Sequence, residues 1–144
     1  QKVVVEPGLI LKMPLGFSLT VNGELEALGI AGNPIVITAL TDDALGGDSD
    51  NNGATVGSIG DWRTIHFTNA AVPSILEHVT MKYSGWSNSP SVNVAATGAV
   101  RFRHCAFNLG ARPSDPVRID RLASFEIDNT AQGDSCGGRR SSLR

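Results

Sequence analysis

Two short stretches decide the fold: His78-Val79-Thr80-Met81 and His104-Cys105-Ala106-Phe107. Both read as histidine, apolar, small, apolar, and they begin 26 residues apart. Leu76 and Phe102 keep the same offset, and Ile65 and Val92 lie 27 residues apart. A short apolar unit that recurs at this period predicts a solenoid, in which each coil buries its inner face against its neighbours.

Apolar residues elsewhere alternate with polar ones in short runs, as in Val3–Val5, Ile35–Ile37 and Phe125–Ile127. This period of two is typical of β-strands, and 16 Gly and 7 Pro in 144 residues predict frequent turns. No run keeps a helical period for three turns. The chain is therefore predicted to be all-β, a single parallel β-helix of about four to six coils spanning residues 1–129.

Two segments stand outside the strand pattern. Residues 41–61 are polar and rich in Asp, Asn and Gly, which predicts one long acidic loop inserted in the solenoid. Residues 130–144 are polar and Gly-rich, which predicts a flexible tail that is either native or an addition to the natural chain. Because the chain begins at Gln1 close to a strand, we expect it to be a processed or excised piece of a longer protein.

Net charge and hydropathy argue against two kinds of partner, nucleic acid and the membrane interior. The net charge of −2 argues against non-specific nucleic-acid binding. No apolar run approaches the roughly 20 residues of a membrane span. Cys105 occupies an apolar strand position and is predicted to be a core residue, whereas Cys136 lies in the tail, so the two either pair once or remain reduced.

Several phrases in order resemble right-handed parallel β-helix proteins of the pectin-lyase-like architecture. They are Val5-Glu6-Pro7-Gly8, Asn33-Pro34-Ile35-Val36-Ile37-Thr38, Gly60-Asp61-Trp62 and Leu76-Glu77-His78-Val79, within about residues 3–110. The resemblance implies a right-handed solenoid and a bacterial exported protein, secreted or held at the cell surface. It implies no particular reaction. Arg63 and Thr64 stand where the family usually has Gly, so the turn after Trp62 is expected to differ.

The acidic loop carries the strongest candidate site. Asp48-Ser49-Asp50-Asn51-Asn52-Gly53 matches the first six positions of a calcium loop, in which oxygen ligands alternate and Gly permits a sharp turn. The twelfth position is Ile59 and not Glu, so a site made by Asp48, Asp50 and Asn52 would take a further ligand from outside the motif, which Asp42, Asp43 or Asp61 could supply. The alternatives are a solvated turn cluster and a catalytic role.

An enzyme of the lyase or glycoside hydrolase class would place Asp42, Asp43, Asp48, Asp50 and Asp61 near a cleft. Lyases on this fold generally use a basic residue, and a stripe of Lys82, Arg101 and Arg103 would supply one, although solvent-facing charge is the simpler interpretation.

Three aromatic residues carry a polar group on the ring, an indole N–H or a phenolic hydroxyl. Trp86 follows a Gly in a polar turn and is predicted to be exposed, and with Tyr83 it makes a candidate sugar-stacking surface. Trp62 is predicted to anchor the loop on the core.

The function predicted first is a non-catalytic exported module that is structural or binds polysaccharide, with a calcium-ordered loop. The alternatives are the enzyme above and an assembly module that self-associates through open solenoid ends, because no capping helix is visible at the N-terminal edge.

Overall fold

The computed structural model describes residues 1–69, 72–108, 110–111, 117–119 and 124–128. Within them the chain forms thirteen β-strands and one short 3-10 helix, η1 (Trp86–Asn88). The predicted all-β class is confirmed. Cys136 and the predicted tail at 130–144 lie outside the described residues.

The strands belong to three sheets, which we name A, B and C. Sheet A contains β1 (Lys2–Val5), β4 (Glu24–Leu28), β7 (Ser74–Glu77), β10 (Ala99–Arg103) and β13 (Ser124–Asp128), in that order. Sheet B contains β2 (Ile10–Met13), β5 (Ile35–Ala39), β8 (Val79–Lys82) and β11 (Ala106–Asn108). Sheet C contains β3 (Ser18–Val21), β6 (Thr64–Asn69), β9 (Val92–Thr97) and β12 (Val117–Ile119).

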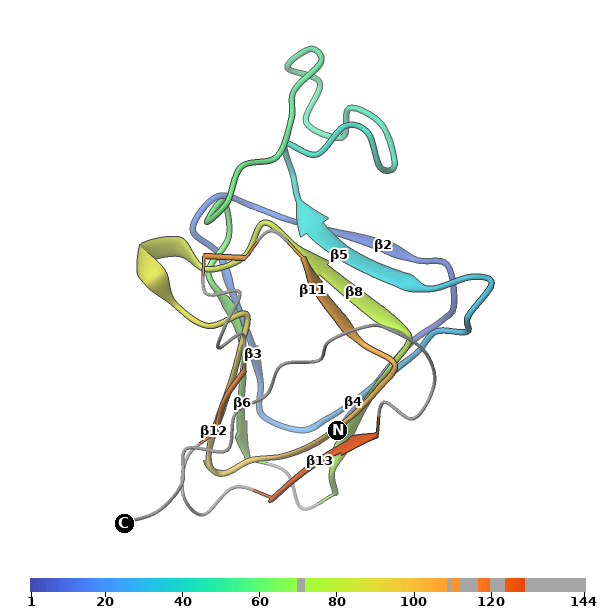
Figure 1. The fold of residues 1–144 in the computed structure, drawn as a ribbon, viewed down its shortest axis with the longest axis vertical. Helices are drawn as coiled ribbons and strands as arrows, with labels where there is room; N and C mark the ends of the chain where they lie inside the picture. Colours follow the sequence, from blue (N-terminus) through green and yellow to red (C-terminus); the bar gives the residue numbers. More distant parts are fainter. Residues whose placement is uncertain (70–71, 109, 112–116, 120–123, 129–144) are drawn as a thin grey trace.

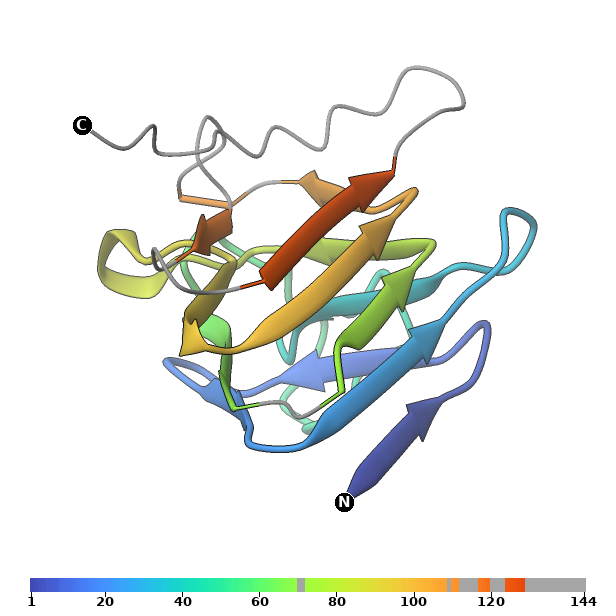
Figure 2. The same cartoon turned by 90° about the horizontal axis from the view of Figure 1, so that it is seen from below.

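All neighbouring strands within the three sheets are parallel. The chain visits sheets A, B and C in turn and then repeats the circuit, so strands distant in sequence lie side by side. Seen down the stack, the three sheets form the sides of a triangle (Figure 1). Seen from the side, the strands lie above one another from the N-terminus to β13 (Figure 2). This arrangement is compatible with a parallel β-helix.

The offsets in the sequence set the register of the strands. Leu76 lies opposite Phe102, Met81 opposite Phe107, and Ile65 opposite Val92. The predicted repeat is therefore confirmed: equivalent residues of successive units are strand neighbours. Strands in such a ladder lie about 4.8 Å apart, so each inner side chain contacts its equivalents in the units before and after.

The core fills the inside of the triangle. Inward side chains alternate with outward ones, and Trp62, the predicted loop anchor, is fully buried. Cys105 is also buried, as predicted, and its thiol donates to the Leu76 carbonyl oxygen at 3.2 Å. The largest fully buried side chains, including one or more from each sheet, are Trp62, Phe67, Phe102, Ile35, Ile65, Leu76, Met81, Val79, Val92, Val94, Val100 and Val117.

A histidine lies at the corner between sheet A and sheet B in each of two successive units. His78 (φ 46°) and His104 (φ 50°) both adopt the left-handed conformation that few non-Gly residues occupy. Their rings stack with centroids 4.7 Å apart. The two histidines thus form a ladder at this corner, where their backbone conformation turns the chain.

The turn after Trp62 passes directly into β6. The Arg63 amide donates to the Phe17 carbonyl oxygen at 2.8 Å, and Thr64 begins the strand. Within the described residues, no helix has the length and hydrophobicity that a membrane crossing requires.

Candidate functional site

The long acidic segment leaves the end of β5 and returns at the start of β6, and all of its residues are described and lie outside strands. It projects from one corner of the triangle (Figure 1). Its base rests on an outward row of sheet B. Lys12 of β2 lies opposite Thr38 of β5, and Ile37 lies opposite Met81, which brings Thr38 beside Lys82.

Asp42 makes the first brace between the loop and the sheet. It lies in a turn after β5 and is only 1% exposed. Its Oδ2 accepts a hydrogen bond from the Thr38 hydroxyl at 2.6 Å and lies 3.1 Å from the Lys82 ammonium nitrogen. A buried carboxylate requires such partners, so Asp42 and Lys82 hold this end of the loop on β8.

Asp43 makes a second brace, toward Lys12 on β2. Its Oδ2 accepts hydrogen bonds from the Thr55 amide at 2.6 Å and the Thr55 hydroxyl at 2.9 Å. Its Oδ1 lies 3.6 Å from the Lys12 ammonium nitrogen. That oxygen is buried, and none of the described residues donates a hydrogen bond to it.

Asp61 closes the base of the loop. Its Oδ2 accepts hydrogen bonds from the Thr41 hydroxyl at 2.6 Å and the Ser58 amide at 2.8 Å. Asp61 lies outside the calcium-loop motif, and these two contacts join it to residues near both ends of the loop. It serves as a turn clamp and is not in the carboxylate group described below.

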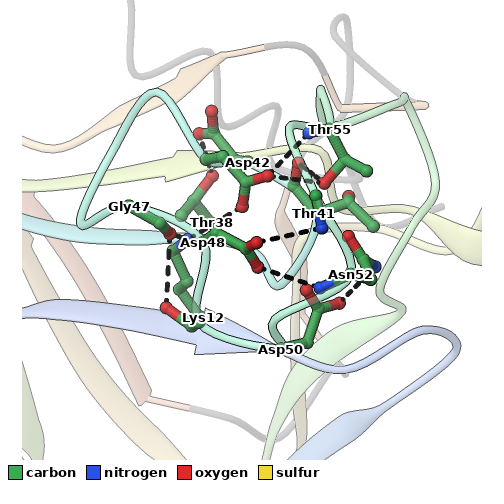
Figure 3. A network of polar contacts seen from close by, with 12 residues as sticks. Lys12, Thr38, Thr41, Asp42, Gly47, Asp48, Asp50, Asn52 and Thr55 are labelled. Carbon is green, nitrogen blue, oxygen red and sulfur yellow. Dashed lines mark hydrogen bonds and ion pairs between the residues drawn. The ribbon is translucent and has the colours of Figure 1, made fainter.

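The tip of the loop is an exposed turn organised by Asp48 (Figure 3). The amides of Gly53 (3.0 Å) and Asn52 (3.3 Å) donate to its two carboxylate oxygens, and Gly53 has a φ of 92°. The Gly53 amide is the main cause that lowers the pKa of the Asp48 carboxyl below its usual 3.8. Asn52 donates its side-chain amide to Asp50 Oδ2 at 2.8 Å.

The loop folds so that Asp43, Asp48 and Asp50 converge. One carboxylate oxygen from each residue lies within 4.8 Å of the others. Of the predicted metal ligands, the structure brings these three together, leaves Asp61 at the base and uses the Asn52 amide to orient Asp50. Oxygen atoms of this kind are the ligands that calcium prefers.

The aromatic residues occupy three different environments. Trp62 donates its indole N–H to the Lys82 carbonyl oxygen at 2.7 Å. Tyr83 is half-buried. Gly57 of the loop lies so close to its ring that a Cβ at this position would come within 2.5 Å of the ring atoms. Trp86 is 39% exposed, as predicted, and packs beside Gly16. Of the two predicted ligand-binding aromatics, Trp86 is the exposed one and Tyr83 is half-buried.

The outer face of sheet C carries a polar row that the sequence analysis missed. Thr20 lies opposite His66, His66 opposite Asn93, and Asn93 opposite Arg118. Thr20 and Arg118 are exposed, and His66 and Asn93 are half-buried, whereas the flanking residues Ile65, Phe67, Val92, Val94 and Val117 are buried. The signal was available in the sequence, because these four residues share one phase of the repeat.

The basic stripe, the alternative to solvent-facing charge, does not form. Lys82 lies on β8 of sheet B, whereas Arg101 and Arg103 lie on β10 of sheet A. Arg103 instead pairs with Glu77 of the neighbouring strand, with 4.0 Å between Nη1 and Oε2. Charged residues on different sides of the triangle cannot line one groove, so this arrangement was wrong.

No family model, curated protein or solved structure matches this chain. The residues of the site are therefore the basis for a functional proposal.

Proposed function

We propose that this protein is a non-catalytic exported module that binds polysaccharide along the outer face of sheet C. The observation that carries the proposal is the row Thr20, His66, Asn93 and Arg118, one residue on each strand of the sheet. Hydroxyl, imidazole, amide and guanidinium groups donate hydrogen bonds to sugar hydroxyls or carboxylates. Their spacing of about 4.8 Å along the stack suits a ligand that is itself a linear repeat.

Trp86 supports the same face. It begins η1, at the corner where the chain passes from sheet B toward β9 of sheet C (Figure 1). Trp86 is 39% exposed at this corner, and an exposed aromatic residue can provide a stacking surface for a sugar ring. Tyr83 contributes indirectly in this proposal, by supporting the loop at Gly57.

The positions of the acidic residues favour binding over catalysis. Asp42, Asp43 and Asp61 each accept hydrogen bonds from threonines that hold the loop together. A general acid or nucleophile must face the scissile bond, and these three carboxylates face the loop and the sheet B residues beneath it. We infer that their role is structural.

The loop is proposed to take up calcium through Asp43, Asp48 and Asp50, with Asn52 positioning Asp50. The fit rests on Asp43, which belongs to the converging group and whose buried Oδ1 receives no hydrogen bond from the described residues. A divalent cation would supply the missing partner and would cross-link the tip of the loop to its base. Calcium therefore orders the loop in this proposal and takes no part in a reaction.

The finer features of the fold belong to the same proposal. A right-handed coil is the expected hand of parallel β crossovers. Sheets of five, four and four strands support a coil count within the predicted range. The pectin-lyase-like architecture and the secreted or cell-surface location rest on the resemblance in the sequence. Self-association through the solenoid ends stays a prediction from the sequence alone.

Binding is tested with a panel of neutral and acidic polysaccharides in affinity electrophoresis. Trp86→Ala is expected to weaken retardation by about fivefold, since stacking of one aromatic ring contributes about 1 kcal/mol. Asn93→Ala should weaken it less. Ile30→Ala, which removes an exposed apolar side chain outside sheet C, is the matched control and should bind like the parent. No retardation by any polysaccharide would refute the proposal.

A further inference from the structure

Lys12 lies beneath the acidic loop, against Asp43, and not on the surface. It is an outward residue of β2, yet its side chain is only 8% exposed because the loop covers it. Its ammonium group donates to the Gly47 carbonyl oxygen and lies 3.6 Å from Asp43 Oδ1 (Figure 3). A lysine usually extends its charged end into water, so this position requires an explanation.

The ammonium group faces the oxygens that a hard cation would use. Gly47 immediately precedes Asp48, and Asp43 Oδ1 is the buried oxygen to which no described residue donates a hydrogen bond. At 3.6 Å, the contact with Lys12 compensates the charge of Asp43 but is too long for a good hydrogen bond. The charge is therefore balanced while the oxygen keeps its capacity to coordinate.

We propose that Lys12 is a tethered counter-ion of Asp43 at the edge of the acidic group, and that calcium binds to this group by displacing it. This inference rests on the calcium site proposed above. Calcium carries twice the charge and takes six to eight oxygen ligands, whereas an ammonium group offers three donors. The lysine stem can swing the displaced ammonium group into water. Competition with Lys12 would then set the calcium concentration at which the loop becomes ordered.

Lys82 provides the contrast within the same loop. It pairs with Asp42, and Asp42 does not belong to the converging group. Lys82 should therefore brace the loop without competing for calcium. Lys2 pairs with Glu24 and Glu26 on sheet A, away from the loop, and controls for the change in net charge.

The test is calorimetric titration of chelator-stripped protein with calcium chloride, for the parent, Lys12→Met, Lys82→Met and Lys2→Met. Lys12→Met is expected to bind calcium about tenfold more tightly than the parent, which corresponds to about 1.4 kcal/mol of removed competition. Lys2→Met should match the parent, and Lys82→Met should not bind more tightly.

The outcomes separate this inference from the calcium proposal. If the parent binds no calcium and Lys12→Met does, the counter-ion role stands and the proposed calcium-ordered loop fails. If the parent binds and Lys12→Met binds equally or more weakly, the counter-ion role is overturned and the calcium site stands. If neither binds, both are overturned.

A second measurement needs no variant. The rate at which an amine-acylating reagent modifies Lys12 in the parent protein is followed by peptide mass spectrometry, with Lys2 as the internal reference. Saturating calcium should raise the Lys12 rate several-fold over the rate in EGTA. An unchanged Lys12 rate in protein that binds calcium would overturn the displacement.

Discussion

The brace between Asp42 and Lys82 gives the most quantitative prediction. Replacing Asp42 with Asn keeps the shape of the side chain and removes its charge. Lys82 would then lose the carboxylate that lies 3.1 Å from its ammonium nitrogen, in a position where its side chain is 22% exposed. Breaking a fully buried pair costs about 3–5 kcal/mol, but a lysine that reaches water recovers part of this. We therefore expect Asp42→Asn to lower the free energy of unfolding by about 2 kcal/mol.

The assay is urea unfolding followed by tryptophan fluorescence, in EGTA so that calcium does not contribute. A double-mutant cycle with Lys82→Met should give a coupling energy of about 1–2 kcal/mol. In a thermal melt the Asp42→Asn midpoint should fall by about 4–8 °C. Asp50→Asn, at the exposed tip, is the control and should change the stability by less than about 0.5 kcal/mol. A loss below that value for Asp42→Asn would refute the idea that this pair holds the loop on sheet B.

Three further predictions concern the corner, the loop tip and the core. His104→Val should destabilise by about 1–3 kcal/mol, since a β-branched residue resists the φ of 50°, whereas His104→Asn should cost less, and chemical denaturation compares the two. The lowered pKa of Asp48 means that its stabilising contribution is complete above 3.8 and is lost as the pH falls through the folded-state value, so the difference in melting midpoint between the parent and Asp48→Asn should shrink only in that acidic range. Trp62→Phe removes the indole donor to the Lys82 carbonyl oxygen and should cost about 1–3 kcal/mol in urea unfolding, and a neutral result would mean that this hydrogen bond does not anchor the loop.

The repeat in the sequence was sufficient to predict the strand pairing. An inner residue and its equivalent about one unit later had to be neighbours, and the pairs Leu76–Phe102 and Ile65–Val92 are. The phase of a strand also decides which side chains face inward, so the burial of Cys105 followed from the pattern.

The contacts of the loop could not be predicted in the same way. Residues 41–61 have no repeat phase, so their partners depend on how the loop folds over sheet B. Lys12 precedes Asp43 by 31 residues and lies on a strand of the preceding unit. Its register with Thr38 places it under the loop, and the 26-residue offset between these two residues was the available signal.

The basic stripe failed for a related reason. Lys82 and Arg101 share a charge but occupy different phases of the repeat. Since one unit crosses all three sheets, residues about 20 apart fall on different sides of the triangle. The row on sheet C shows the converse. Its members share one phase of the repeat although they differ in chemistry, and they are Thr20, His66, Asn93 and Arg118.

The proposed function is that the protein holds an intact polysaccharide on the outer face of sheet C. The direct measurement is size-exclusion chromatography of fluorescently labelled polysaccharides after prolonged incubation with the protein and calcium. We expect one class of polysaccharide to co-elute with the parent protein at unchanged chain length, and co-elution to weaken with Trp86→Ala. Shortened chains would show that the protein is an enzyme, and the absence of co-elution for every polysaccharide would contradict the binding function.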